Sequence, residues 1–133
     1  MILLDTHVWI WWVNGLLERI PQAERELIAQ APMLAVSVMS CLEMAWLVRR
    51  GRIELEIPLA QWFDLALEGS EIQLLPLTPR LAERAAELPE HHKDPADRVI
   101  IATAIEHRYR LISLDEKFPL YMELGELLLP IRQ

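Results

Sequence analysis

Cysteine, glycine and basic residues are all scarce in this sequence of 133 residues. Cys41 is the single cysteine, so no disulfide can form within the chain, and we expect a protein of the reducing cytoplasm. Four glycines are too few for a Walker-type phosphate loop or a dinucleotide-binding turn. The net charge of −7 argues against a protein that coats nucleic acid through bulk charge. The negative net charge is still compatible with a nuclease, because some of the acidic side chains can bind metal.

Long apolar segments are also missing. The apolar run Val8–Val13 is far shorter than the roughly 20 residues that cross a bilayer, so we expect no membrane span. The start of the chain lacks the basic segment of a secretory signal. Hydrophobic residues make up 53% and charged residues 25% of the sequence, which is typical of a globular protein. We therefore expect one domain, residues 1–133, with a true hydrophobic core.

Apolar runs that favour strands alternate along the chain with segments that favour helices. Strands are expected at 2–5, 34–37, 72–77, 111–114 and 127–131. Helices are expected from the first strand to Asn14-Gly15, and at 21–31, 40–50, 58–69, 79–88 and 94–109. This alternation predicts an α/β fold in which a parallel sheet of about five strands is flanked by helices.

Four acidic residues fall where one edge of such a sheet would gather them. Asp5 and Asp115 end expected strands, whereas Glu43 and Asp97 lie in the first turns of expected helices. Strand C-termini and helix N-termini share one edge in parallel α/β folds, so the four should converge there. Two carboxylates ~5 Å apart at an effective dielectric near 20 repel by roughly 3 kcal/mol. A hard divalent cation, Mg²⁺ or Mn²⁺, would relieve this repulsion.

Each of these acids also has an ordinary structural explanation. Asp5 and Asp97 could cap or stabilise a helix start, and Asp115 could be a loop residue. Glu43 follows Ser40 with the spacing of a capping box, in which the glutamate bonds back to the serine amide. Capping predicts no convergence of the four side chains. Their shared edge therefore favours a metal site.

Basic and histidine side chains are weaker candidates. The cluster Arg49–Arg52 is expected at the end of its helix opposite Glu43, where it would complement the helix dipole. Arg98 follows Asp97 and is better placed to contact a phosphate. His91-His92 lacks the further spaced ligands of a zinc site.

Five tryptophans are many for a domain of this length. Trp9 and Trp12 lie three apart on one helix face, and Trp11 points elsewhere, so the core cannot take them all. We expect an apolar docking surface that includes Trp9, Trp11, Trp12 and Trp46.

The order and spacing of these motifs resemble the PIN-domain family, and within it the VapC-type toxin ribonucleases. The matching stretches are Leu3-Leu4-Asp5-Thr6-His7, Val36-Ser37 with Ser40-x-x-Glu43, Asp94-Pro95-Ala96-Asp97-Arg98-Val99-Ile100-Ile101-Ala102-Thr103-Ala104, and Leu111-Ile112-Ser113-Leu114-Asp115. The third stretch is the most specific. Asp94 is an extra acid found in one branch, and Ser113 stands where many members have threonine.

The resemblance implies an Mg²⁺- or Mn²⁺-dependent endoribonuclease, the toxin of a toxin–antitoxin module. Asp5, Glu43, Asp97 and Asp115 match the family's acidic quartet, which holds the metal that activates water against RNA. It further implies a small antitoxin, which we expect to dock through an amphipathic helix, and we expect a homodimer. The alternatives are a nuclease of RNA processing and a catalytically silent interaction domain, although the intact quartet argues against silence. A phosphoacceptor signalling domain would need paired acids near the N-terminus and an aspartate at the end of a mid-chain strand, and neither is evident here.

Overall fold

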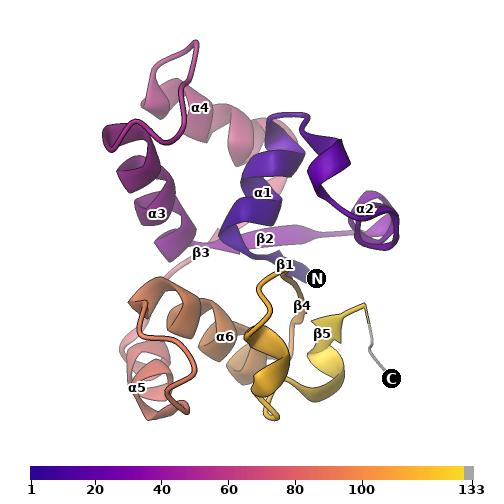
Figure 1. Ribbon diagram of the computed structural model, residues 1–133, viewed down its shortest axis with the longest axis vertical. Coiled ribbons are helices and arrows are strands. Elements are labelled where there is room, and N and C mark those ends of the chain that lie inside the picture. The colour runs from indigo at the N-terminus through magenta and orange to yellow at the C-terminus, as the bar shows by residue number, and fades with distance from the viewer. Residues whose placement is uncertain (131–133) are drawn as a thin grey trace.

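Five parallel strands form the centre of the computed structural model, which describes residues 1–130 (Figure 1). They are β1 Ile2–Leu4, β2 Leu34–Ser37, β3 Ile72–Leu75, β4 Arg110–Ile112 and β5 Leu128–Leu129, in the order β3-β2-β1-β4-β5. In the centre, Leu3 of β1 lies opposite Ala35 of β2 and Leu111 of β4. The strand order reverses beside β1, which is where such sheets open a crevice at their carboxyl edge. The expected α/β class and parallel sheet are confirmed.

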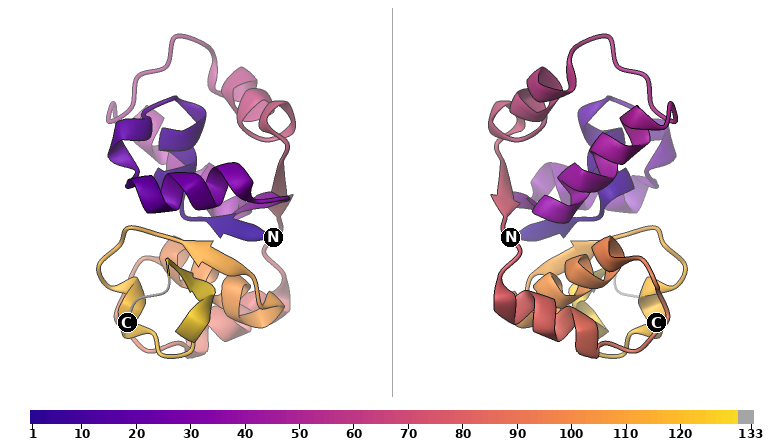
Figure 2. Two further views of the ribbon diagram at one scale, coloured as in Figure 1. Left: turned by 90° about the vertical axis from the view of Figure 1, so that its right-hand side faces the viewer. Right: turned by 90° about the vertical axis from the view of Figure 1, so that its left-hand side faces the viewer.

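Helices cover both faces of this sheet. They are α1 Thr6–Val13, α2 Gln22–Gln30, α3 Val38–Arg49, α4 Leu59–Ala66, α5 Pro79–Glu87 and α6 Pro95–His107. Figure 1 shows α1 to α4 on one side of the strands and α5 and α6 on the other, and Figure 2 shows the same division from two sides. Within residues 1–130, no helix has both the length and the hydrophobicity that a bilayer crossing requires.

Alternating side chains of the strands divide the core into two clusters. Ile2 and Leu4 of β1 pack with α1 to α4, whereas Leu3 packs with α5 and α6. Trp9 belongs to the first cluster, fully buried, with its indole Nε1 donating to the Ala66 carbonyl at 3.1 Å. The expectation that Trp9 belongs to an exposed docking surface is therefore wrong.

Helix α3 begins at Val38 rather than at Ser40. Ser37 ends β2 and caps the helix, because its Oγ accepts a hydrogen bond from the Met39 amide at 3.1 Å. Glu43 consequently lies in the second turn, too far along the helix to close a capping box. The capping explanation for Glu43 is excluded.

The other sequence boundaries agree to within a few residues. Helix α6 starts as expected, since Asp94 caps it by accepting from the Ala96 amide at 2.8 Å and Pro95 takes the first position. Strand β5 is shorter than the expected 127–131, and Ile131 lies outside the described residues. The extent of the domain over residues 131–133 stays a prediction.

Arg98 holds the connection between α5 and α6 together. Its guanidinium donates hydrogen bonds of 2.7–3.4 Å to backbone oxygens of Ala85, Ala86, Leu88, Pro89 and His92. Several of these are carbonyls at the α5 terminus that have no partner within the helix. A guanidinium offers five N–H donors, and all are used here, so the expected contact of Arg98 with phosphate is wrong.

Replacing Arg98 by alanine should lower the free energy of unfolding by about 2–4 kcal/mol, because partly buried carbonyls would lose a charged donor. Arg80 gives a matched control on α5, since its salt bridge with Glu106 leaves the arginine exposed. Exposed ion pairs contribute little, so Arg80→Ala should leave stability almost unchanged. Urea unfolding of both variants measures the difference. Equal losses would show that Arg98 is no anchor.

Candidate active site

Carboxylates from four elements meet at the carboxyl edge of the sheet, where β1 and β4 end. Asp5 follows β1, Asp115 lies beyond β4, Glu43 comes from α3 and Asp97 from the first turn of α6. All four line one cavity of about 390 Å³, together with Asp94. The structure thus brings together the four acids that the sequence singled out.

Asp5 is buried between two hydrogen-bond donors. Its Oδ1 accepts from the Thr6 amide at 2.8 Å, which caps α1, and its Oδ2 accepts from Ser113 Oγ at 2.7 Å. Burial raises the pKa of Asp5, and these two hydrogen bonds oppose the rise. Each carboxylate oxygen has a second lone pair, so capping and a ligand role are compatible for Asp5.

Glu43 is positioned by the first residue of α1. Thr6 Oγ1 donates to Glu43 Oε1 and lies 2.8 Å from Ser40 Oγ, so a hydroxyl pair fixes the carboxylate. The pKa of Glu43 is raised to about 7. Burial is the largest cause, the charges of Asp5 and Asp94 act in the same direction, and the Thr6 hydrogen bond opposes the rise. Ser40 therefore helps to place Glu43 but does not cap α3.

Asp97 lies where the charges of its neighbours add up. Burial, and after it the charges of Asp5 and Glu43, together raise the pKa of Asp97 to about 7. Within residues 1–130, no lysine or arginine forms a salt bridge with any of these three acids. Their negative charge is thus left without a protein cation.

His92 is the functional candidate that the sequence pattern undervalued. It is buried in the loop before α6, with Nε2 3.0 Å from Asp115 Oδ2 and Nδ1 2.9 Å from the Tyr121 hydroxyl. That hydroxyl already accepts from the His92 amide at 3.1 Å. The network is complete when Tyr121 donates to Nδ1 and the Nε2 proton points at Asp115, so we assign this tautomer.

Asp115 is held on both oxygens. Its Oδ2 faces His92, and its Oδ1 accepts from the Lys117 amide at 2.7 Å. Ser113 Oγ accepts from the Asp115 amide at 3.1 Å while it donates to Asp5. Donor atoms of His92, Asp97 and Asp115 lie within 4.8 Å of one another, close enough to share a cation.

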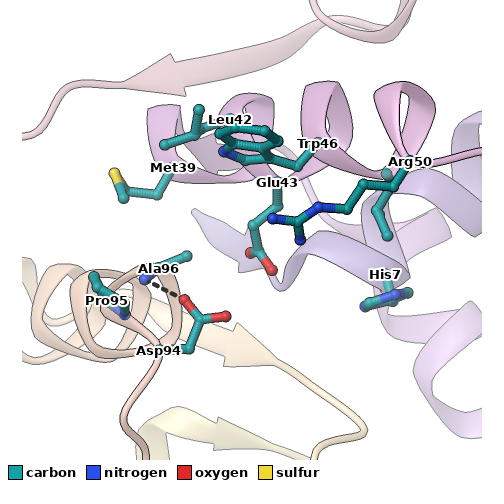
Figure 3. Close-up of a pocket in the computed structure, with 10 residues that line it drawn as sticks. His7, Met39, Leu42, Glu43, Trp46, Arg50, Asp94, Pro95 and Ala96 are labelled. Carbon is teal, nitrogen blue, oxygen red and sulfur yellow. Dashed lines mark hydrogen bonds between the residues drawn. The ribbon is translucent and has the colours of Figure 1, made fainter. Parts of the chain in front are cut away.

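A second cavity of about 370 Å³ adjoins the first and shares His7, Glu43 and Asp94 with it (Figure 3). Arg50 lines this cavity, although its cluster was expected at the edge opposite Glu43. Figure 3 shows the Arg50 side chain running back along α3 toward Glu43, the direction that helical side chains favour. The expected separation of Arg50 from Glu43 is wrong.

Comparison with known proteins identifies the family. Residues 2–123 match the family model described as "PIN domain". This chain belongs to the PIN-domain family. It is 40% identical over 117 residues to a protein named Ribonuclease VapC22 from Mycobacterium tuberculosis, covering 87% of this chain and 88% of that protein.

Solved structures share the fold of this PIN domain. A toxin–antitoxin complex from Klebsiella pneumoniae contains a chain with a TM-score of 0.64 and 27% identity, covering 89% of this chain and 90% of that one. A chain of VapBC2 from Rickettsia felis, solved with a promoter DNA fragment, has a TM-score of 0.66, with coverage of 92% and 95%. The sequence identity to this second chain is 18%, so the similarity shows a shared fold and nothing more.

The donor set of this PIN domain fits a hard divalent ion. The cavity offers carboxylate oxygens, whereas both ring nitrogens of His92 are engaged, with Asp115 and with Tyr121. Oxygen-rich sites of this kind suit Mg²⁺ or Mn²⁺, whereas zinc sites are usually built from nitrogen and sulfur ligands. Burial and the charges of neighbouring acids raise the pKa of Glu43 and Asp97 to about 7, so a cation bound among them would favour their ionised forms.

The metal-free protein should lose stability as the pH rises from the ordinary carboxyl values, 3.8 for Asp97 and 4.5 for Glu43, to about 7. In this window the folded state binds more protons than the unfolded state, so stability falls as those protons leave. Urea unfolding in EDTA across the window measures the slope. Asp97→Asn and Glu43→Gln should each flatten it, and the exposed Glu90→Gln should not. An unchanged slope in the two cavity variants would contradict the assignment.

Proposed function

We propose that this protein is a divalent-metal-dependent endoribonuclease and the toxin of a toxin–antitoxin module, acting in the cytoplasm. The convergence of Asp5, Glu43, Asp97 and Asp115 in one cavity carries the proposal. The identity of 40% to Ribonuclease VapC22 supports RNA as the substrate. The likeness to a chain of the Klebsiella pneumoniae toxin–antitoxin complex supports the toxin role.

Asp5, Glu43 and Asp97 would hold Mg²⁺ or Mn²⁺, with Asp115 completing the set. PIN-domain nucleases use divalent metals, and carboxylates are the ligands that these ions prefer. Bound there, the ion would lower the pKa of a water molecule and offset negative charge on the scissile phosphate.

The protein's own groups prepare this site by orienting the acids. Thr6 donates to one oxygen of Glu43, Ser113 donates to one oxygen of Asp5, and His92 donates to Asp115. The other lone pairs of these carboxylates stay available to the cavity. The first cavity has no serine, threonine or cysteine in its lining. Water is therefore the nucleophile in this proposal, and no covalent intermediate with the protein is needed.

Asp97→Asn and Glu43→Gln should each reduce RNA cleavage by roughly 10²-fold or more, because metal assistance supplies several kcal/mol of barrier lowering. Ser37 caps α3, so Glu43→Gln should keep the fold. Millimolar Mn²⁺ should raise the melting temperature of the wild type, and Asp97→Asn should remove most of that rise. Glu90→Gln is the control for both assays. Full cleavage by folded variants, with no Mn²⁺-dependent rise, would overturn the proposal.

The partner we propose is a small antitoxin that docks an amphipathic helix onto α1 and α2. A groove between these helices has Trp12, Leu17 and Ala29 as its apolar lining and the polar Gln22, Arg25 and Glu26 beside them, and Leu17 is 37% exposed. An apolar groove of this kind suits a helix with one apolar face. We also propose that the protein forms a homodimer, which sedimentation analysis would test.

Co-expression with the neighbouring gene should yield a complex with suppressed RNA cleavage. Leu17→Glu should weaken this complex, because it places a charge in the groove, while leaving the cleavage by the free protein intact. Leu120→Glu is the matched control, since Leu120 is exposed but lies outside the groove. Pull-down and cleavage assays report both effects. Failure to capture a small partner, or equal effects of the two variants, would count against the docking site.

A further inference from the structure

Arg50 is a cation beside the acidic cavity that pairs with none of its carboxylates. It lines the second cavity with Glu43 and Asp94, yet within the described residues its guanidinium forms no salt bridge. Its Cζ instead lies 4.8 Å from the centre of the Trp46 ring (Figure 3). A guanidinium stacked on an aromatic face keeps its in-plane N–H donors available. Unlike Arg98, Arg50 is therefore free to bind an anion.

Trp46 is the most exposed of the five tryptophans, since Trp11 and Trp12 are half-buried. Trp9 and Trp62 are buried, and their indole nitrogens donate to Ala66 and Asn14. Trp46 is 44% exposed on α3, one turn from Glu43. An exposed indole next to an acidic cavity offers an aromatic surface to whatever enters that cavity.

We propose that Trp46 and Arg50 form a nucleotide subsite, in which a base of single-stranded RNA stacks on the indole and Arg50 binds an adjacent phosphate. This subsite rests on the proposed ribonuclease function. It marks the place where the substrate strand leaves the acidic cavity. The two cavities share His7, Glu43 and Asp94, so a strand cut in the first continues directly into the second.

The distribution of charge around Arg50 favours RNA over a protein partner as the ligand of this surface. The chain carries a net charge of −7, and the first cavity adds clustered carboxylates, so a phosphodiester needs a local cation. Among residues 1–130, Arg50 is the one lysine or arginine that lines either of the two cavities. Phosphate contacts position a strand, whereas stacking tolerates any base. The subsite therefore favours unpaired RNA over duplex and confers little sequence preference.

The test measures RNA binding in the non-cleaving Asp97→Asn background. Fluorescence anisotropy of a fluorescein-labelled single-stranded oligoadenylate is recorded with Mg²⁺ at several salt concentrations. Arg50→Ala should weaken binding about tenfold and reduce the salt slope by about 0.7, the value for one lost phosphate contact on a single strand. Arg49→Ala is the matched control, because it removes the same charge from the adjacent position, outside both cavities.

The Trp46 variants test the stacking contact separately. Trp46→Ala should weaken binding by roughly 5- to 100-fold, the usual loss for one stacked base, and Trp46→Phe should retain most of the affinity. Binding of an RNA duplex should respond to Arg50→Ala but not to Trp46→Ala. Sedimentation of every variant checks the oligomeric state.

Equal effects of Arg50→Ala and Arg49→Ala would overturn the phosphate contact. If Trp46→Ala leaves RNA affinity unchanged and instead disrupts a dimer or an antitoxin complex, the surface is a protein interface and the subsite is overturned. A wild type that cleaves RNA alongside such results keeps the ribonuclease function. A wild type that neither binds nor cleaves RNA removes both proposals.

Discussion

The site of this PIN domain depends on the burial of several carboxylates in one cavity. Asp5, Glu43 and Asp97 line one cavity, and burial, with the negative charge of neighbouring acids, raises the pKa of each. Hydroxyl groups of Thr6 and Ser113 orient two of these acids. Because a hydroxyl donates a hydrogen bond without bringing a charge, it fixes the carboxylate but leaves the negative charge for a cation. An arginine in the same place would neutralise the site.

The helices around this cavity help to stabilise its negative charge. Asp5 and Asp97 lie at the N-termini of α1 and α6, where the helix dipole favours negative charge. Helix α6 is buried along most of its length, and Arg98 ties the preceding loop to α5. The same loop delivers His92 to Asp115. One structural arginine thus supports a functional position without contacting the cavity.

Local sequence patterns predicted the parts of the site that depend on local structure. Asp5 and Asp115 follow apolar runs, and Asp97 follows an Asp-Pro helix start, so parallel topology alone brings them to one edge. Glu43 reaches the same edge from the second turn of α3 rather than the expected first turn, because Ser37 and not Ser40 caps this helix. His92 ranked among the weaker candidates because its partners Asp115 and Tyr121 lie 23 and 29 residues away in the chain. Contacts over such distances are set by packing, which periodicity does not encode.

In the proposed subsite, the stacking of Arg50 on Trp46 would resolve a conflict between the needs of metal and substrate. A divalent ion needs the carboxylates uncompensated, whereas a phosphodiester needs a cation nearby. A direct salt bridge between Arg50 and Glu43 would satisfy neither, since it would occupy an acid and consume the guanidinium. The indole holds the guanidinium beside the cavity and apart from the acids, so both charges stay available. The position of Trp46 on the same helix as Glu43 is what makes this separation possible.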